Sequence, residues 1–298
     1  MQMPWLPFQP IHAPVENTPL PEGYKTYLAD PGYMKRESTT QAGFTLVGAP
    51  DCTGVSWKYG PVRFERYVGD VEPVYDATGP YRLVTWQRVN SNVIPKGWWT
   101  TRLVMNTSRT GFATIDGAPD YFKKWDSHAQ RHRKTWLKQG AEWEIVPITV
   151  DEYLTAYKRC KQDAFLKFLF SSMLKQKAKG HGALLHIVGA RLKAPHSQVE
   201  AGFAFIDVPE TQQSIHLMSF HSEEAKKVSI GTGLMDYWFL RAPEAGIKYL
   251  EFGCFWTPGE PKSWQGFSKF KAQFGLQFTD YPQPLARFMG KAPLSFGK

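Results

Sequence analysis

A lysine at the edge of an aromatic stripe is the residue best placed to do chemistry. At about 100° per residue, Trp264, Phe267, Phe270 and Phe274 share one side of the helix that their spacing predicts. Lys271 lies beside Phe267 at the margin of that stripe. One interpretation is that its stem covers apolar surface while its ammonium reaches water. The other is a cation held in a cleft, where it meets an anion or a developing oxyanion.

A buried strand before this helix would position the lysine. Residues 247–255 form a short apolar run, which is typical of a central strand covered on both faces. Prolines and a glycine in residues 257–261 cannot continue a strand ladder, so a turn follows, and Ser263 can cap the helix. Glu251 in the strand could orient an amine, or it could pair with Lys271 in a structural role.

Two short motifs in this stretch resemble those of a known family. Residues 249–253 are YLEFG, and residues 270–275 are FKAQFG, preceded by Gly266. In FemABX-like acyltransferases a Y-x-D-F-G strand precedes a helix with F-K-x-x-F-G, so the chain resembles the C-terminal signature of that family. Glu251 stands where the family usually has aspartate. A basic helix ending in R-x-x-x-x-K-x-G also precedes the second unit of such proteins, which extends the resemblance to about residues 119–285.

The resemblance implies an α/β fold of the GNAT type (acyl-CoA N-acyltransferase), a mixed sheet flanked by helices that the family often carries twice. It implies that an acyl or aminoacyl group moves onto an amine, and that Lys271 stabilises the charge on the tetrahedral intermediate. Phe255, Trp264 and Phe270 would shape the substrate pocket. His216 lies on a predicted strand where GNAT-type enzymes place a base; an ordinary half-buried histidine is the alternative.

A glycine-containing segment before another helix is the candidate cofactor-binding site for an anion. Its members are Lys226, Lys227, Ile230, Gly231, Thr232 and Gly233, and the following helix is expected to begin at Leu234. In GNAT enzymes, [QR]-x-x-G-x-[GA] at this place cradles a pyrophosphate with backbone N–H groups and a helix N-terminus. Val228 stands where glutamine or arginine belongs, which weakens the case for coenzyme A, and FemABX-like proteins also lack the motif. A plain helix entry is the alternative.

The predicted elements divide the chain into three parts. Residues 1–23 contain six prolines and form an expected N-terminal arm. Residues 24–118 are an expected β-rich half, which is either a degenerate GNAT-like unit or an unrelated β-rich domain. Its strands are expected at 44–47, 62–68, 81–86 and 101–105. Residues 119–298 are the expected GNAT-like acyltransferase domain: after an initial helix come a strand, two helices, three strands, a helix, a strand, a helix and a strand.

Local patterns set the expected helices of this domain. Residues 119–140 are expected to form one basic helix that ends at a glycine, and Thr149 with Glu152 forms a capping box. A further helix over 163–179 is expected to bury one apolar side. The residues expected to point inward there are Phe165, Phe168, Leu169, Met173 and Leu174.

The net charge of +9 is concentrated in the second part of the chain. Residues 1–119 hold 11 Lys/Arg against 10 Asp/Glu, and residues 120–298 hold 25 against 17. The basic part is therefore the expected contact for a polyanion, although many soluble enzymes are as basic. The candidate acyl donors are charged tRNA, acyl-CoA and an acyl carrier protein, with no tightly bound cofactor. The acceptor is an amine, including one on a modified nucleic-acid base. A non-catalytic nucleic-acid-binding protein on a GNAT scaffold is the alternative function.

Composition also says which classes are not expected. The chain has no apolar run of about 18 residues that could span a membrane. Its N-terminus lacks a basic region followed by an apolar one, so a cytoplasmic protein is expected. Cys52, Cys160 and Cys254 are too far apart for metal-ligand spacing, so free thiols and no metal are expected.

Overall fold

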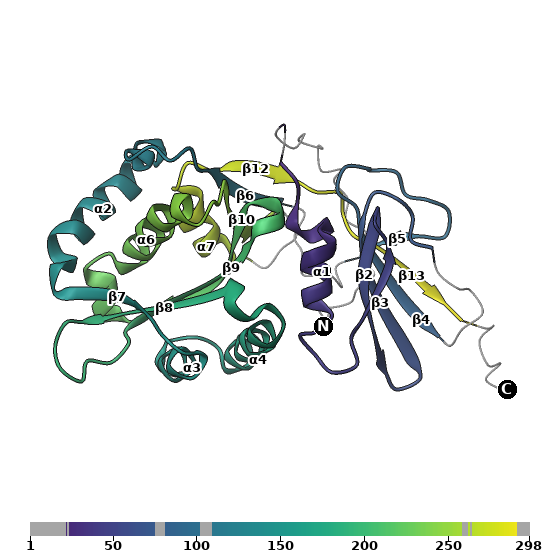
Figure 1. The fold of residues 1–298 in the computed structure, drawn as a ribbon, viewed down its shortest axis with the longest axis horizontal. Coiled ribbons are helices and arrows are strands. Elements are labelled where there is room, and N and C mark those ends of the chain that lie inside the picture. The colour runs from purple at the N-terminus through teal and green to yellow at the C-terminus, as the bar shows by residue number, and fades with distance from the viewer. Residues whose placement is uncertain are drawn as a thin grey trace. The chain divides into compact units, whose positions relative to one another are not determined.

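The computed structural model describes residues 22, 24–74, 81–101, 109–257, 262 and 264–290. The chain falls into two compact units (Figure 1). The first comprises residues up to 110 together with 254–264 and 278–298, and the second comprises 111–253 and 265–277. Segments from both ends of the chain therefore build the first unit, a division that differs from the expected boundary between residues 118 and 119. Most of the expected arm over 1–23 lies outside the described residues.

A six-stranded sheet with the order β1-β2-β3-β4-β13-β5 forms the first unit. Its elements are η1 (Tyr27–Ala29), α1 (Pro31–Glu37), β1 (Thr45–Ala49), β2 (Cys52–Tyr59), β3 (Val62–Gly69), β4 (Arg82–Gln87), β5 (Trp99–Thr100) and β13 (Leu285–Met289). The β3–β4 pair is parallel and its neighbours are antiparallel. The strands expected near 44–47, 62–68 and 81–86 are present, whereas residues 102–105 of the fourth lie outside the described residues. Sequence reasoning missed β2, because polar residues and a glycine interrupt its apolar run.

A seven-stranded sheet with the order β12-β6-β11-β10-β9-β8-β7 carries the remaining elements. Its strands are β6 (Arg109–Thr114), β7 (Trp143–Pro147), β8 (Leu185–Leu192), β9 (Ala201–Val208), β10 (Gln213–His221), β11 (Tyr249–Cys254) and β12 (Gln277–Asp280). Its helices are η2 (Tyr121–Lys124), α2 (Ser127–Gln139), η3 (Gly140–Glu142), α3 (Val150–Arg159), α4 (Ala164–His181), η4 (Gly182–Leu184), η5 (Pro209–Thr211), α5 (Glu223–Lys227), α6 (Ile230–Glu244) and α7 (Trp264–Ala272). The expected order from β7 onward is confirmed, with α5 as an additional short helix.

Helices cover both faces of this sheet: α3 and α4 lie on one face, and α2 and α6 lie on the other (Figure 1). An aromatic cluster joins the sheet to α6. The Trp238 ring is 5.2 Å, centroid to centroid, from both Phe203 on β9 and Phe252 on β11. Its indole N–H also donates to the Ser214 hydroxyl of β10 at 2.8 Å. The three central strands are thereby fixed against one helix.

Capping side chains decide where the helices of this unit begin. Asp126 accepts the N–H of Ala129 at 2.7 Å, so the helix expected over 119–140 is divided into η2 and α2. The capping box of Thr149 and Glu152 at α3 is confirmed. Helix α6 begins at Ile230 rather than at Leu234, since the Ser229 carbonyl already accepts the N–H groups of Thr232 and Gly233 at 3.0 and 3.2 Å.

The inward-facing residues expected for α4 are wrong at two positions. Phe165 is 67% exposed and Phe168 is 72% exposed, whereas Leu174 is fully buried. Leu174 packs into the core together with the partly buried Phe170 and Met173. At about 100° per residue, Phe165 lies about 180° from Leu174 around the helix, so it faces solvent.

Candidate functional site

The two central strands of the second unit separate soon after they meet. Residues Gln213–Ile215 of β10 pair in parallel with Tyr249–Glu251 of β11 over three positions. Between His216 and Met218 the register of β10 against β9 shifts by a bulge. The β11 backbone then turns at Gly253, where φ is 69°. Backbone groups beyond Ile215 and Glu251 therefore lose their partners in this ladder.

Lys271 of α7 occupies the point where the strands part. Its Nζ donates to the Phe252 carbonyl oxygen at 2.6 Å and lies 5.0 Å from the centroid of the Phe267 ring. The residue is 8% exposed, so its ammonium is held in place rather than extended into solvent. A charged donor thus satisfies a strand carbonyl that β10 does not reach.

His216 of β10 lies close to this lysine and is neutral at pH 7. Burial lowers its pKa well below the usual value, and the positive charge of Lys271 lowers it further, while a hydrogen bond to the Phe252 backbone acts in the opposite direction. The imidazole stacks on Phe203, with ring centroids 5.1 Å apart. Within the described part of the chain, its buried Nε2 has no hydrogen-bond partner.

Glu251 is 1% exposed at the last paired position of β11. Its Oε1 accepts the backbone N–H of Gly253 at 3.3 Å, across the position where the strand turns. This contact stabilises the turn of β11 at Gly253, so the Glu251 carboxylate has a structural role.

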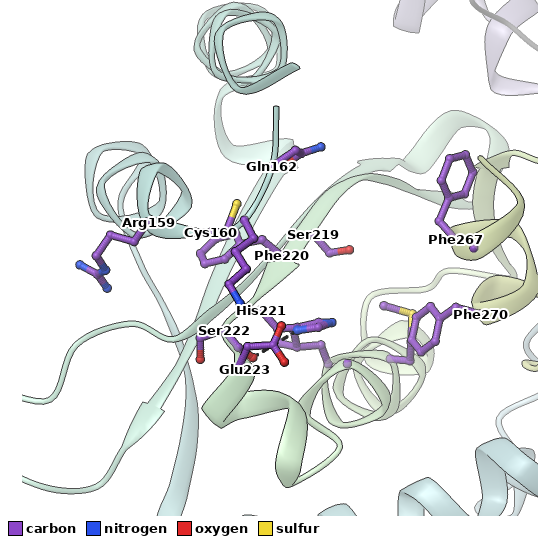
Figure 2. A pocket seen from close by; sticks show the side chains of 15 residues that line it. Arg159, Cys160, Gln162, Ser219, Phe220, His221, Ser222, Glu223, Phe267 and Phe270 are labelled. Atoms are coloured by element: carbon purple, nitrogen blue, oxygen red, sulfur yellow. Dashed lines mark hydrogen bonds between the residues drawn. The ribbon is translucent and has the colours of Figure 1, made fainter. Parts of the chain in front are cut away.

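A cleft of about 550 Å³ opens within the second unit beside the separated strands. Figure 2 shows Arg159, Cys160 and Gln162 on one side of it and Phe267 and Phe270 on the other. The lining residues are Arg159, Cys160, Lys161, Gln162, Ser219, Phe220, His221, Ser222, Glu223, Gly231, Leu234, Met235, Gly266, Phe267 and Phe270. This volume suits a small-molecule or acyl group. Lys271 and His216 do not line the cleft, but Phe267 separates it from the Lys271 ammonium.

The glycine-containing segment contributes one residue to the cleft. Gly231 lines it, and a Cβ at that position would lie 3.4 Å from Phe270 Cζ. Gly233 instead faces Trp136, whose ring atoms lie 2.6 Å from where a Cβ would be. Ile230 and Thr232 are buried. The segment is therefore the first turn of α6, and only part of it is available to a ligand.

The remaining predicted residues are scattered. Lys226 and Lys227 are exposed on α5, and Lys227 Nζ pairs with Glu224 at 2.7 Å. Trp264 is half-buried at the start of α7 and does not line the cleft. Phe255 belongs to the first unit, where it is 3% exposed and packs edge-on against Phe278.

Several cleft residues were not singled out from the sequence. Cys160, Ser219 and Phe220 come from the link after α3 and from the end of β10. Burial raises the pKa of the Cys160 thiol, which disfavours a nucleophilic thiolate. The sequence signal that could have found them is positional: Ser219 and Phe220 lie near the end of the fourth strand of the predicted unit, and Cys160 directly follows α3. All three cysteines are free, and the described residues contain no cluster of three metal-binding side chains.

The basic helix α2 is partly a structural element. Arg133 pairs with the buried Asp236 of α6 and lies 4.1 Å from the centroid of the Phe122 ring. The Tyr121 hydroxyl donates to the same carboxylate. Lys134 and Lys138 are exposed. Arg133 therefore joins two helices and does not belong to a surface for a polyanion.

The chain is similar to known proteins in structure but not in sequence. No protein-family model matches the chain, and no curated protein matches its sequence. The structure of FemX is similar with a TM-score of 0.63 at 9% identity, covering 90% of this chain and 93% of that one. A conserved protein of unknown function from Bacteroides thetaiotaomicron has a similar structure, with a TM-score of 0.57 at 10% sequence identity. The likeness covers 87% of this chain and 89% of that one. The structure of L-PGS from Bacillus licheniformis is similar with a TM-score of 0.52 at 11% sequence identity, covering 85% of this chain and 86% of that one.

These likenesses extend over both units and concern the fold. They confirm a mixed α/β architecture with two sheets flanked by helices. No helix among the described residues is both long enough and apolar enough to cross a membrane. The chain therefore resembles FemABX-like proteins of the GNAT superfamily in its fold as well as in its C-terminal motifs.

Proposed function

We propose that this protein is an acyltransferase that moves an acyl or aminoacyl group onto an amine. The carrying observation is the cleft beside the parted strands β10 and β11, with the buried Lys271 ammonium fixed directly behind its Phe267 wall. The FemX-like fold and the FKAQFG motif support the same assignment. Fold alone hosts many functions, so the site carries the proposal.

The reaction needs a polarised carbonyl, a free amine and an acceptor for its proton. In our proposal the amine nitrogen attacks the acyl carbon and forms a C–N bond, and the donor's C–O or C–S bond breaks. Lys271 stabilises the oxyanion of the tetrahedral intermediate, and its bond to Phe252 fixes the charge in position. The amine proton passes to water in the cleft, and water returns a proton to the leaving oxygen or sulfur, because the buried His216 does not line the cleft. Phe270 and Gly231 shape the acyl pocket.

Aminoacyl-tRNA is the donor we favour over acyl-CoA. The position that holds glutamine or arginine in coenzyme A-dependent GNAT enzymes is Val228 here, and the carboxylate-bearing Glu223 lines the cleft nearby. A negative charge there opposes a pyrophosphate. Arg159 and Lys161 also line the cleft and offer positive charge to a nucleic-acid end. An acyl carrier protein remains the third donor to test, and a cytoplasmic location would suit charged tRNA.

The test is transfer of label from charged tRNA, acyl-CoA and acyl carrier protein to a panel of amines, using Lys271→Met and Lys269→Met. Lys269 is exposed on the same helix two residues earlier, so it is a matched control. We expect the Lys271 variant to lose transfer while folded and the Lys269 variant to keep it. Full activity in folded Lys271→Met would remove the catalytic assignment.

The basic charge of the second part of the chain also fits a non-catalytic nucleic-acid-binding protein. Such a protein would bind RNA with an affinity that falls steeply as salt rises, and would transfer no label from any donor. The same panel, run at two salt concentrations, separates this function from the enzyme.

A further inference from the structure

Helix α4 presents apolar side chains to solvent at its first turn. Phe165 is 67% exposed, Phe168 is 72% exposed and Leu166 is 37% exposed. Single exposed apolar residues are common on protein surfaces. Phe165 and Phe168 lie about 60° apart on one side of the helix, so two exposed aromatic rings are neighbours there, an arrangement of the kind that marks a binding surface.

Basic side chains continue the same side of the helix. At about 100° per residue, Phe165, Phe168, Lys175 and Lys179 fall within an arc of about 80°, centred well away from the buried Leu174. Lys175 and Lys179 are exposed, and neither has an ion-pair partner among the described residues. We call these four residues the α4 stripe. The stripe therefore has two phenylalanine side chains in the first turn of α4 and two lysine side chains near its C-terminal end.

The charge around the stripe is strongly one-sided. Residues 158–181 hold seven Lys/Arg and one acidic residue, Asp163. That carboxylate accepts the backbone N–H groups of Phe165 and Leu166 at 2.9 and 3.2 Å, so it serves as the helix cap. The electrostatic complement of this segment is an extended anionic surface.

We propose that the α4 stripe docks on the surface of an anionic lipid bilayer. Phenylalanine side chains gain free energy at the boundary between headgroups and acyl chains, and lysines beside them meet anionic headgroups. RNA would use the lysines, but it offers no apolar layer to Phe165 and Phe168. A bilayer therefore accounts for both ends of the stripe.

Docking in this way would place a bilayer close to the cleft. Arg159, the last residue of α3, and Lys161, in the link that leads into α4, both line the cleft. The proposal concerns a surface and does not depend on acyl transfer, so it stands or fails independently of the proposed function.

The experiment is co-sedimentation of the full chain with vesicles of about one third phosphatidylglycerol and two thirds phosphatidylcholine. Phe165→Ser with Phe168→Ser should lower the partition coefficient about tenfold or more. Lys175→Gln with Lys179→Gln should lower it about fivefold per lysine, because a lysine near an anionic surface contributes ~1 kcal/mol. Purely phosphatidylcholine vesicles should bind the wild type weakly.

Two variants serve as matched controls. Lys134→Gln with Lys138→Gln removes two exposed lysines of the same spacing from α2, and Tyr59→Ser removes a 79% exposed aromatic ring from β2. Both should bind vesicles as the wild type does, and circular dichroism should show that every variant is folded. Absence of vesicle binding by the wild type, or equal losses in stripe and control variants, overturns the proposal. Loss of RNA affinity in the stripe variants without any vesicle binding would overturn it in favour of a nucleic-acid surface.

Discussion

The two glycines at the start of α6 should respond in opposite directions to alanine. A Cβ at Gly231 would lie 3.4 Å from Phe270 Cζ, an ordinary contact distance, so Gly231→Ala should gain helix propensity of about 0.5 kcal/mol. A Cβ at Gly233 would lie 2.6 Å from two ring carbons of Trp136. The indole cannot yield as a flexible chain end would, so overpacking should cost about 1–3 kcal/mol. After the same propensity gain, the net loss should be about 0.5–2.5 kcal/mol.

Urea denaturation followed by circular dichroism measures both changes. The expected difference between the two variants is about 2 kcal/mol in the free energy of unfolding, with an unchanged denaturant slope. Because Gly231 also lines the cleft, its variant should bind the acyl donor more weakly although it is the more stable protein. Destabilisation by both substitutions to a similar extent, or stabilisation by Gly233→Ala, would refute the packing argument.

Three further predictions concern buried charge. Lys271→Met should lower the free energy of unfolding by about 1–3 kcal/mol in urea, because it removes a charge-assisted hydrogen bond to the Phe252 carbonyl; equal stability would show that this bond is dispensable. Since burial lowers the pKa of His216 in the folded state, its neutral form stabilises the fold above the unfolded pKa of about 6.5, and that stability is lost as the pH falls. His216→Phe should therefore lose less stability than the wild type between about pH 7 and pH 5, and parallel curves would contradict this. Arg133→Met should cost roughly 2–4 kcal/mol by leaving Asp236 buried without its cation, and Arg133→Met with Asp236→Leu should recover most of it in a double-mutant cycle.

The order of elements after β7 was predictable because its signals are local. The capping box at Thr149 and the apolar runs of β8–β11 each depend on neighbours in the sequence. The first unit was harder, since β13 joins β4 and β5 across nearly 200 residues. No local pattern indicates such a partner.

The sequence singled out Lys271 but did not predict most of the residues that line the cleft. A lysine beside an aromatic stripe left two interpretations open, and the structure agrees with a buried ammonium near Phe267 rather than with one that reaches water. The cleft lies beside the bulge in β10, and no residue type in this strand predicts the position of a bulge. The outward direction of Phe165 depends on which side of α4 meets the sheet, and an aromatic residue by itself predicts burial.

Donor affinity tests the central claim most directly. Charged tRNA, uncharged tRNA and acyl-CoA should be titrated against the wild type and Gly231→Ala, whose added methyl group enters the cleft beside Phe270. The account predicts tighter binding of charged than of uncharged tRNA, and loss of that difference in the variant. Equal affinity for charged and uncharged tRNA in the wild type, with no saturable binding of acyl-CoA, would contradict an acyl-donor site in this cleft.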